Sequence, residues 1–177
     1  QIIDRGLLGP INMVELTTNR NSPWGAWVWD IHPEGNAKTI DWKTFQEPVA
    51  LRNRIPFGDE ALKRFFRWRC WYDYGTGLSG DLLSHDYDTI NQIMNIGIPK
   101  YASSTGGIYF YKDGRDVPDV WNATFEFPDK DLTVLYSATL SSNNPRGNRI
   151  MGHDATMMMG GQSGGGNIHG FIVTPDD

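Results

Sequence analysis

Two acidic residues and a histidine stand at helical spacing near the middle of the chain: Asp81, His85 and Asp88. Positions i, i+4 and i+7 of an α-helix lie on one side, so a single helix would present all three together. An aspartate one turn before a histidine can accept a hydrogen bond from the ring, fix its tautomer and raise its basicity. The spacing is therefore typical of a general acid or base. Surface capping with salt bridges and a metal site are the alternatives.

A glycine pattern that binds dinucleotides in other proteins comes directly before these residues, at Gly75, Gly77 and Gly80. A dinucleotide site also needs a buried strand before the first glycine and an acidic residue about 20 positions later. Here the preceding residues are "RWRCWYDY", and the position 20 beyond the last glycine is Lys100. We therefore expect no cofactor-binding residue in this chain, and we interpret the glycines as the start of a helix.

The helix that must position the candidate residues is expected from about Leu78 to Ile96, where apolar side chains form a stripe. Gly97 is expected at its C-cap and Pro99 just beyond. A shorter amphipathic helix is expected to begin near Asp59, whose carboxylate could cap it.

The first 58 residues are expected to contain the end of a helix, one strand and then a long irregular segment. Residues 1–10 read as the last turn of a helix, and residues 11–20 have enough β-branched and apolar side chains for a strand. Prolines and scattered tryptophans then predict a long irregular excursion over 21–58. Cys70 is the only cysteine, and we interpret it as a small buried hydrophobe rather than a nucleophile.

After Pro99 the pattern changes to strands with alternating side chains, over 104–114, 121–140, 148–161 and 167–175. Short turn sequences separate these strands, so an antiparallel meander is expected. The predicted fold class is α+β, with a mostly antiparallel open sheet and helices packed on one face.

Composition limits both the number of domains and the partners. A chain of 177 residues is long enough for one well-packed domain and too short for two full-sized ones. Its net charge of −5 provides no electrostatic footprint for nucleic acid. No apolar run approaches the roughly 20 residues that would span a bilayer, so no membrane partner is expected.

The segment "WRCWYDYGTGLSGDLLSHDYDTINQIMNIGIPKYASSTGG" resembles the C-terminal domain of the Gfo/Idh/MocA oxidoreductases, relatives of glucose-fructose oxidoreductase and inositol dehydrogenase. "RGLLGPINMVEL" before it and "DVPDVWNATFEFPDKDLTVLYSATL" after it extend the resemblance, which runs from about Gly6 to Pro175. Its most specific part is G-x-G-x3-D-x3-H-x2-D.

This resemblance implies a two-domain enzyme in which an N-terminal Rossmann domain binds NAD or NADP. That domain and the family's E-K-P motif are absent from residues 1–177, so the chain is expected to be the substrate-binding and oligomerisation domain alone, inactive by itself. The implied substrate is a sugar, cyclitol or related polyol. The sequence itself leaves the compartment open: the cytoplasm is expected, or the periplasm if an export signal preceded Gln1.

The family's D-x3-H falls on Asp81 and His85. By resemblance, His85 would take the hydroxyl proton as hydride leaves the same carbon, while Asp81 would orient it and bind a substrate hydroxyl. Asp88 would be structural. The family usually has a small residue two positions before the histidine, where this chain has Leu83, a departure that bears on the shape of the pocket.

Three residues before the motif, Arg69, Trp71 and Tyr74, are candidates for the pocket lining. Aromatic faces suit sugar C–H groups, although core packing accounts for the rings equally well. By resemblance, a second copy would meet the sheet face through apolar strand residues, with the following candidates: Phe125, Phe127, Val134 and Tyr136.

Three other functions remain open. The seven tryptophans could serve as stacking platforms of a noncatalytic carbohydrate-binding or assembly module. Metal-dependent hydrolysis could use Asp81 and His85. Some relatives use bound NAD for glycoside cleavage, which would give a net reaction without redox change.

Overall fold

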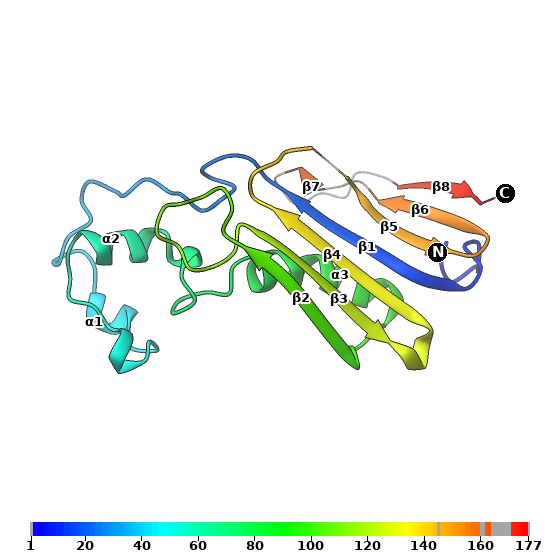
Figure 1. The fold of residues 1–177 in the computed structure, drawn as a ribbon, viewed down its shortest axis with the longest axis horizontal. Helices are drawn as coiled ribbons and strands as arrows, with labels where there is room; N and C mark the ends of the chain where they lie inside the picture. The colour runs from blue at the N-terminus through cyan, green and yellow to red at the C-terminus, as the bar shows by residue number, and fades with distance from the viewer. Residues whose placement is uncertain (1, 145, 160–161, 164–170, 177) are drawn as a thin grey trace.

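The computed structural model describes residues 2–144, 146–159, 162–163 and 171–176, which form one sheet and three α-helices (Figure 1). The strands are β1 (Ile11–Asn19), β2 (Tyr101–Gly107), β3 (Val120–Phe127), β4 (Leu132–Thr139), β5 (Asn148–Gly152), β6 (Ala155–Met159), β7 (Gln162–Ser163) and β8 (Phe171–Pro175). The helices are α1 (Trp42–Phe45), α2 (Asp59–Phe66) and α3 (Ser84–Met94). The expected α+β class with a mostly antiparallel open sheet is confirmed.

The strand order is β2-β3-β4-β1-β5-β6-β8, and β7 pairs with the end of β1. Neighbouring strands run antiparallel except at β1, which is parallel to β4 and to β7. The first strand of the chain therefore lies in the middle of the sheet, between the β3–β4 and β5–β6 hairpins. The expected simple meander is wrong at this point, because a two-residue period predicts a strand but not its neighbours.

The strand boundaries differ from the prediction after α3. β2 ends at Gly107, and the chain from 108 to 118 is a loop rather than the second half of a strand at 104–114. The predicted segments 121–140 and 148–161 each form an antiparallel pair, β3–β4 and β5–β6, and the tight turn between β3 and β4 includes Asp131 in the left-handed conformation (φ 49°). Residues 167–170 of the last expected strand lie outside the described residues.

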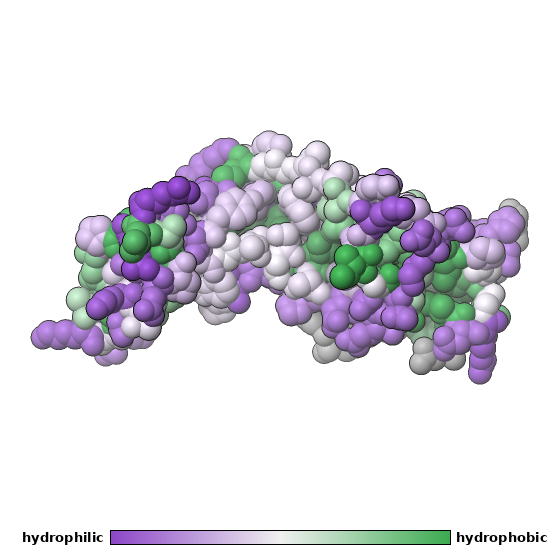
Figure 2. Space-filling view, turned by 90° about the horizontal axis from the view of Figure 1, so that it is seen from below, coloured by the Kyte–Doolittle hydropathy of each residue, from purple (hydrophilic) through white to green (hydrophobic). Residues whose placement is uncertain are grey.

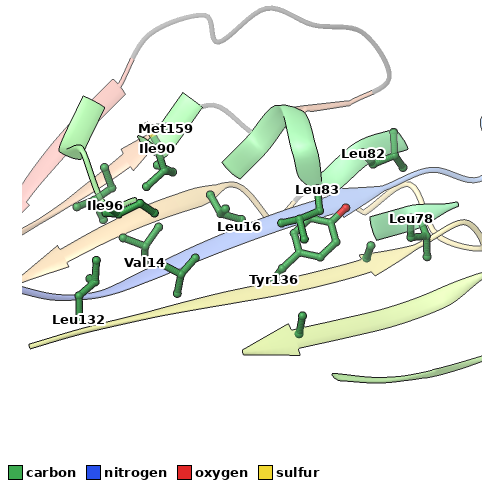
Figure 3. Packing of buried hydrophobic residues seen from close by; sticks show 14 of the residues in the cluster. Val14, Leu16, Leu78, Leu82, Leu83, Ile90, Ile96, Leu132, Tyr136 and Met159 are labelled. Atoms are coloured by element: carbon green, nitrogen blue, oxygen red, sulfur yellow. The ribbon is translucent and has the colours of Figure 1, made fainter. Parts of the chain in front are cut away.

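The core lies between the sheet and α3, which covers one face (Figures 1 and 3). Val14 and Leu16 of β1 and Tyr136 of β4 belong to the same buried cluster as Leu83 and Ile90. Full burial of each aliphatic side chain contributes about 1.5–3 kcal/mol. This packing fixes the helix, and therefore everything on its outer side, relative to the centre of the sheet.

The residues expected to meet a second copy face this core instead. Val134, Tyr136 and Phe127 are buried on the α3 side, and Phe125 packs edge to face against Tyr87 with ring centroids 5.8 Å apart. The strand period explains the correction, because alternate residues point to opposite faces and the apolar set faces the helix. The opposite, open face carries largely polar side chains, among them Glu15, Thr17, Thr133, Ser137 and Arg149.

Seen from the side, the molecule is long and arched, and its hydrophobic side chains form separate patches among hydrophilic ones (Figure 2). One end is the sheet, and the other contains α1 and α2 (Figure 1). The second end has its own small core, in which Trp42 and Ala61 are buried with partly buried aromatic side chains around them. None of the helices in the described part has the length and hydropathy that a bilayer crossing requires.

Helix ends follow capping chemistry that the sequence indicated only in part. Gly58, not Asp59, is the N-cap of α2, and Asp59 lies in the first turn, where a negative charge is favourable. α3 ends at Met94 because Asn95 adopts the left-handed conformation (φ 50°), so the expected cap at Gly97 is wrong. Asparagine tolerates this conformation better than most residues. Residues 2–8 form turns rather than a helix, and 21–58 is largely irregular, as expected.

Candidate functional site

A pocket of about 610 Å³ lies where the end of β1, the loop after it and the start of the α3 helical segment come together. This volume falls within the usual range for small-molecule sites, about 300–1,000 Å³. The described residues that line it are Arg20, Ser22, Trp24, Gly25, Trp27, Trp29, Arg69, Asp81, Leu82, His85 and Asn143. Three of the sequence candidates, Arg69, Asp81 and His85, are therefore brought together.

The helical segment begins with a π-helical turn, Ser79–Leu83, which continues directly into α3. Short π-helical turns occur frequently at functional sites. Leu82 lines the pocket, whereas Leu83 points to the sheet and lies against the Tyr136 ring (Figure 3). The departure at Leu83 therefore bears on the core rather than on the pocket. Asp88 lies outside the pocket lining, where its Oδ2 accepts a hydrogen bond of 2.6 Å from Gln92.

Asp81 is held by an arginine rather than by the histidine. Its Oδ1 accepts a hydrogen bond of 3.1 Å from Arg69 Nε, and the Arg69 guanidinium lies 4.1 Å from the centre of the Trp68 ring. Its Oδ2 is buried and has no hydrogen-bond partner among the described residues. A buried oxygen without a donor is costly. A ligand hydroxyl reaching the pocket would satisfy it.

His85 lines the same pocket on an exposed part of the helix, and among the described residues its ring has no hydrogen-bond partner. The expected hydrogen bond from His85 to Asp81 is absent. The spacing predicted that both side chains face one pocket, and they do, but the Asp81 carboxylate is oriented by Arg69 rather than by the imidazole. The imidazole can therefore exchange a proton with a ligand.

The pocket wall opposite the helix is a tryptophan loop, residues 22–29, which sequence reasoning did not assign to the site. Trp24 is 67% exposed, and its ring packs edge to face on Trp29 with centroids 4.3 Å apart. Trp27 is buried with a positive φ of 63°, a conformation that non-glycine residues adopt rarely. The signals in the sequence were the scattered tryptophans of the irregular segment 21–58 and the Pro23-Trp24-Gly25 stretch soon after the predicted strand.

Buried polar groups hold the tryptophan loop from behind. Arg115, whose side chain is fully buried, donates to the Ala26 carbonyl at 2.9 Å and forms an ion pair of 2.8 Å with Asp113. Cys70 is 1% exposed, as predicted, with its sulfur 3.8 Å from the Trp27 carbonyl oxygen. Burial raises the pKa of the Cys70 thiol to about 11. The thiol therefore serves in packing, because the thiolate is the reactive form.

Trp71 and Tyr74 do not line this pocket. Trp71 is buried, its indole N–H donates to the Gly114 carbonyl at 3.2 Å, and the Arg64 guanidinium lies over its ring. Tyr74 stacks on Phe45 with ring centroids 5.1 Å apart, in the small aromatic core beside α2. Both rings support the segment that leads into the site.

The glycines before the helix do not form a dinucleotide cradle. A Cβ on Gly80 would lie 1.8 Å from Thr76 Oγ1, and a Cβ on Gly77, whose φ is +57°, would lie 3.0 Å from Val117. The chain reaches Gly75 from a 3-10 turn, Trp68–Cys70, rather than from a strand. Packing of the helix start therefore explains these glycines.

Asp86, which sequence reasoning did not select, attaches the site helix to the sheet. It is 4% exposed, and its Oδ2 accepts a hydrogen bond of 3.1 Å from Thr18, which in turn accepts one from Tyr136. Burial raises the pKa of Asp86, while hydrogen bonds from Thr18 and Asn148 lower it by less. His85 directly precedes Asp86, so the hydrogen bond between Asp86 and Thr18 also fixes the position of His85 relative to the sheet.

We expect Asp86 to make the stability of the protein fall as pH rises above the ordinary pKa range of aspartate. Its pKa is higher in the folded than in the unfolded chain, so the folded state binds more protons in that window. The stability contribution is complete below the unfolded pKa and is lost as pH rises through the folded one. Urea unfolding from pH 4 to 8 should show a falling difference in stability between wild type and Asp86→Asn. A flat or rising difference would contradict this assignment.

Comparisons with known proteins place the fold among oxidoreductases. No protein-family model and no curated protein matches the sequence. An aldose-aldose oxidoreductase from Caulobacter crescentus, complexed with glycerol, is 15% identical at a TM-score of 0.56, covering 99% of this chain and 42% of that one. The WlbA dehydrogenase from Bordetella pertussis, in complex with NADH and UDP-GlcNAcA, is 14% identical at a TM-score of 0.55, covering 90% and 38%.

These similarities establish the fold, and the chain spans about two fifths of the length of those two oxidoreductases. The α+β fold that the resemblance implies for this chain is therefore confirmed. Among the described residues, no three histidine, cysteine, aspartate or glutamate side chains gather where they could hold a metal ion. The carboxylate of Asp81 forms an ion pair with the Arg69 guanidinium.

Proposed function

We propose that this chain is the C-terminal, substrate-binding domain of an NAD(P)-dependent oxidoreductase of the Gfo/Idh/MocA type, acting on a sugar, cyclitol or related polyol. The supporting observation is that Asp81 and His85 line one pocket whose volume suits a small-molecule substrate. The fold adds support, because one structural neighbour binds NADH and a sugar nucleotide and another is an aldose-aldose oxidoreductase.

The two residues have separate tasks in this proposal. Oxidation of an alcohol removes a hydride from carbon and a proton from oxygen, and NAD(P) accepts the hydride. His85 takes the hydroxyl proton, since its ring is exposed to the pocket and uncommitted among the described residues. Asp81 accepts a hydrogen bond from a substrate hydroxyl at Oδ2, while Arg69 fixes Oδ1.

The described residues do not fit NAD(P) itself, because the glycines at 75–80 are filled by packing. The proposal therefore places the nucleotide in a Rossmann domain outside these 177 residues, which alone are expected to be inactive. In this proposal the chain binds the substrate, orients it and removes the proton from its hydroxyl group.

The proposal is tested by assaying the intact gene product for NAD(P)H formation with a panel of sugars, cyclitols and other polyols. We expect turnover on some members, and loss of that turnover when Asp81→Asn removes the second carboxylate oxygen. The absence of NAD(P)-linked turnover on every member would overturn the proposal.

A noncatalytic carbohydrate-binding module is the second candidate, favoured by the Trp24–Trp29 pair at the pocket wall. An exposed indole beside a half-buried one can stack on the C–H face of a sugar. Calorimetric titration separates the two functions, because sugar binding without any NAD(P)-linked turnover favours the module.

The resemblance also places a second copy on the open face of the sheet. That face has a hollow of about 470 Å³ lined by polar residues including Glu15, Ser137 and Arg149. A contact there would depend on polar pairing and weaken with salt. Sedimentation of the intact protein at low and high salt tests this expectation.

A further inference from the structure

The candidate pocket carries more positive than negative charge. Its charged lining residues are Arg20, Arg69 and Asp81, and Arg69 is already paired with Asp81 at 3.1 Å. Among the described residues, the Arg20 guanidinium has no hydrogen bond and no ion pair. One cation in the pocket is therefore left without a counter-charge in contact.

Arg20 is held firmly at its backbone. It directly follows β1, where its N–H donates to the Thr139 carbonyl at 2.9 Å and its own carbonyl accepts from Ser142 at 3.2 Å. Both contacts come from the end of β4 and the turn after it. The position is thus set by the ends of the two central strands, β1 and β4.

The stem of the Arg20 side chain is confined by the tryptophan loop. A Cβ on Gly25 would lie 3.0 Å from Arg20 Cβ and 3.4 Å from its Cδ, so the loop crosses closely above the stem. A glycine at this position lets the backbone approach. Arg20 lines the pocket together with Trp24 of the tryptophan loop.

Asp86 acts electrostatically on Arg20 but forms no ion pair with it among the described residues. Its carboxylate is hydrogen-bonded to Thr18 and Asn148 instead. Burial lowers the pKa of Arg20, by more than Tyr136 and Asp86 raise it, with Arg69 also lowering it. A guanidinium stays charged in proteins, and its five N–H donors match a carboxylate or phosphate in bidentate geometry.

We propose that Arg20 binds an anionic substituent of the substrate, so that the pocket takes a polyhydroxy acid or a sugar phosphate in preference to a neutral sugar. This inference rests on the proposed function for the hydroxyl contacts of Asp81 and adds the substrate class. The tryptophan wall receives the ring face, and the guanidinium receives the anionic group.

The test is isothermal titration of the intact protein, with and without saturating NADH or NADPH, using charged and neutral partners. The pairs are D-glucuronate and D-glucose, D-galacturonate and D-galactose, and D-gluconate and D-glucitol, with D-glucose 6-phosphate added to separate phosphate from carboxylate. We expect at least one charged ligand to bind about tenfold or more tightly than its neutral partner, the range of a charge-assisted hydrogen bond. Equal or weaker binding of all charged members would overturn the inference.

Variants assign the preference to one side chain. Arg20→Gln should lower the affinity for the charged ligand by about 10- to 100-fold and leave the affinity for the neutral ligand nearly unchanged. Arg20→Lys should retain part of the preference for the charged ligand. Arg52→Gln, at an exposed arginine outside the pocket lining, is the matched control and should change neither. A charge preference that survives Arg20→Gln, or a loss of NADH affinity instead, would refute the assignment.

The outcomes separate this inference from the proposed function. Arg20-dependent binding of a charged ligand without NAD(P)-linked turnover would defeat the proposed function alone. Turnover of neutral polyols that does not depend on Arg20 would defeat the inference alone.

Discussion

Under the proposed function, replacing His85 with alanine is expected to lower kcat of the intact gene product by about 10²- to 10⁴-fold, the usual contribution of a positioned general base. The imidazole lines the pocket from the exposed side of the helix, so its loss removes the proton acceptor without disturbing the packed side. KM should change much less, because Asp81 and the tryptophan wall remain. Steady-state kinetics with NAD(P) and the best polyol substrate measure both constants.

Two comparisons make the His85 result specific. His153→Ala changes an exposed histidine outside the pocket lining and should leave turnover unchanged. Free imidazole should restore part of the activity of His85→Ala, because the truncated side chain leaves an open position in the pocket. Wild-type turnover in His85→Ala would remove this residue from the mechanism.

The placement of Asp81 and His85 in one pocket was predictable because its geometry is local. Four residues separate Asp81 and His85, and helical spacing alone brings them to one side even with a π-helical turn at the start. Arg69 could be named only through the family resemblance. Its pairing with Asp81 depends on how the 3-10 turn folds back on the helix, which no local pattern encodes.

The rest of the site depends on contacts between distant segments. The tryptophan loop is held by Arg115, which lies 89 residues after Ala26, whose carbonyl it contacts. It is also held by Cys70, which lies 43 residues after Trp27, whose carbonyl the sulfur contacts. Arg20 lies at the pocket because β1 sits parallel to β4 in the centre of the sheet. The sequence period predicts β1 itself but not the strands beside it, so neither feature could be foreseen.

A buried carboxylate behind the pocket provides the largest expected effect on stability. Asp119 is fully buried, and its oxygens accept hydrogen bonds of 2.8, 2.7 and 2.6 Å from the backbone N–H groups of Tyr109, Phe110 and Tyr111. These bonds fold the loop after β2, and the Tyr111 ring then lies 4.8 Å from the Arg115 guanidinium that holds the tryptophan loop. One carboxylate thus supports both this loop and the pocket wall.

Asp119→Ala is expected to reduce the free energy of unfolding by about 3–5 kcal/mol, since three charge-assisted hydrogen bonds are lost and their contributions overlap. Urea unfolding of the 177-residue chain measures the loss. Asp129→Ala, an exposed aspartate in the β3–β4 turn, is the control and should stay within about 0.5 kcal/mol of wild type. A loss below about 1 kcal/mol in Asp119→Ala would mean that the loop after β2 folds without the Asp119 carboxylate. The contacts that lead from Asp119 to the pocket wall would then contribute little to the stability of the protein.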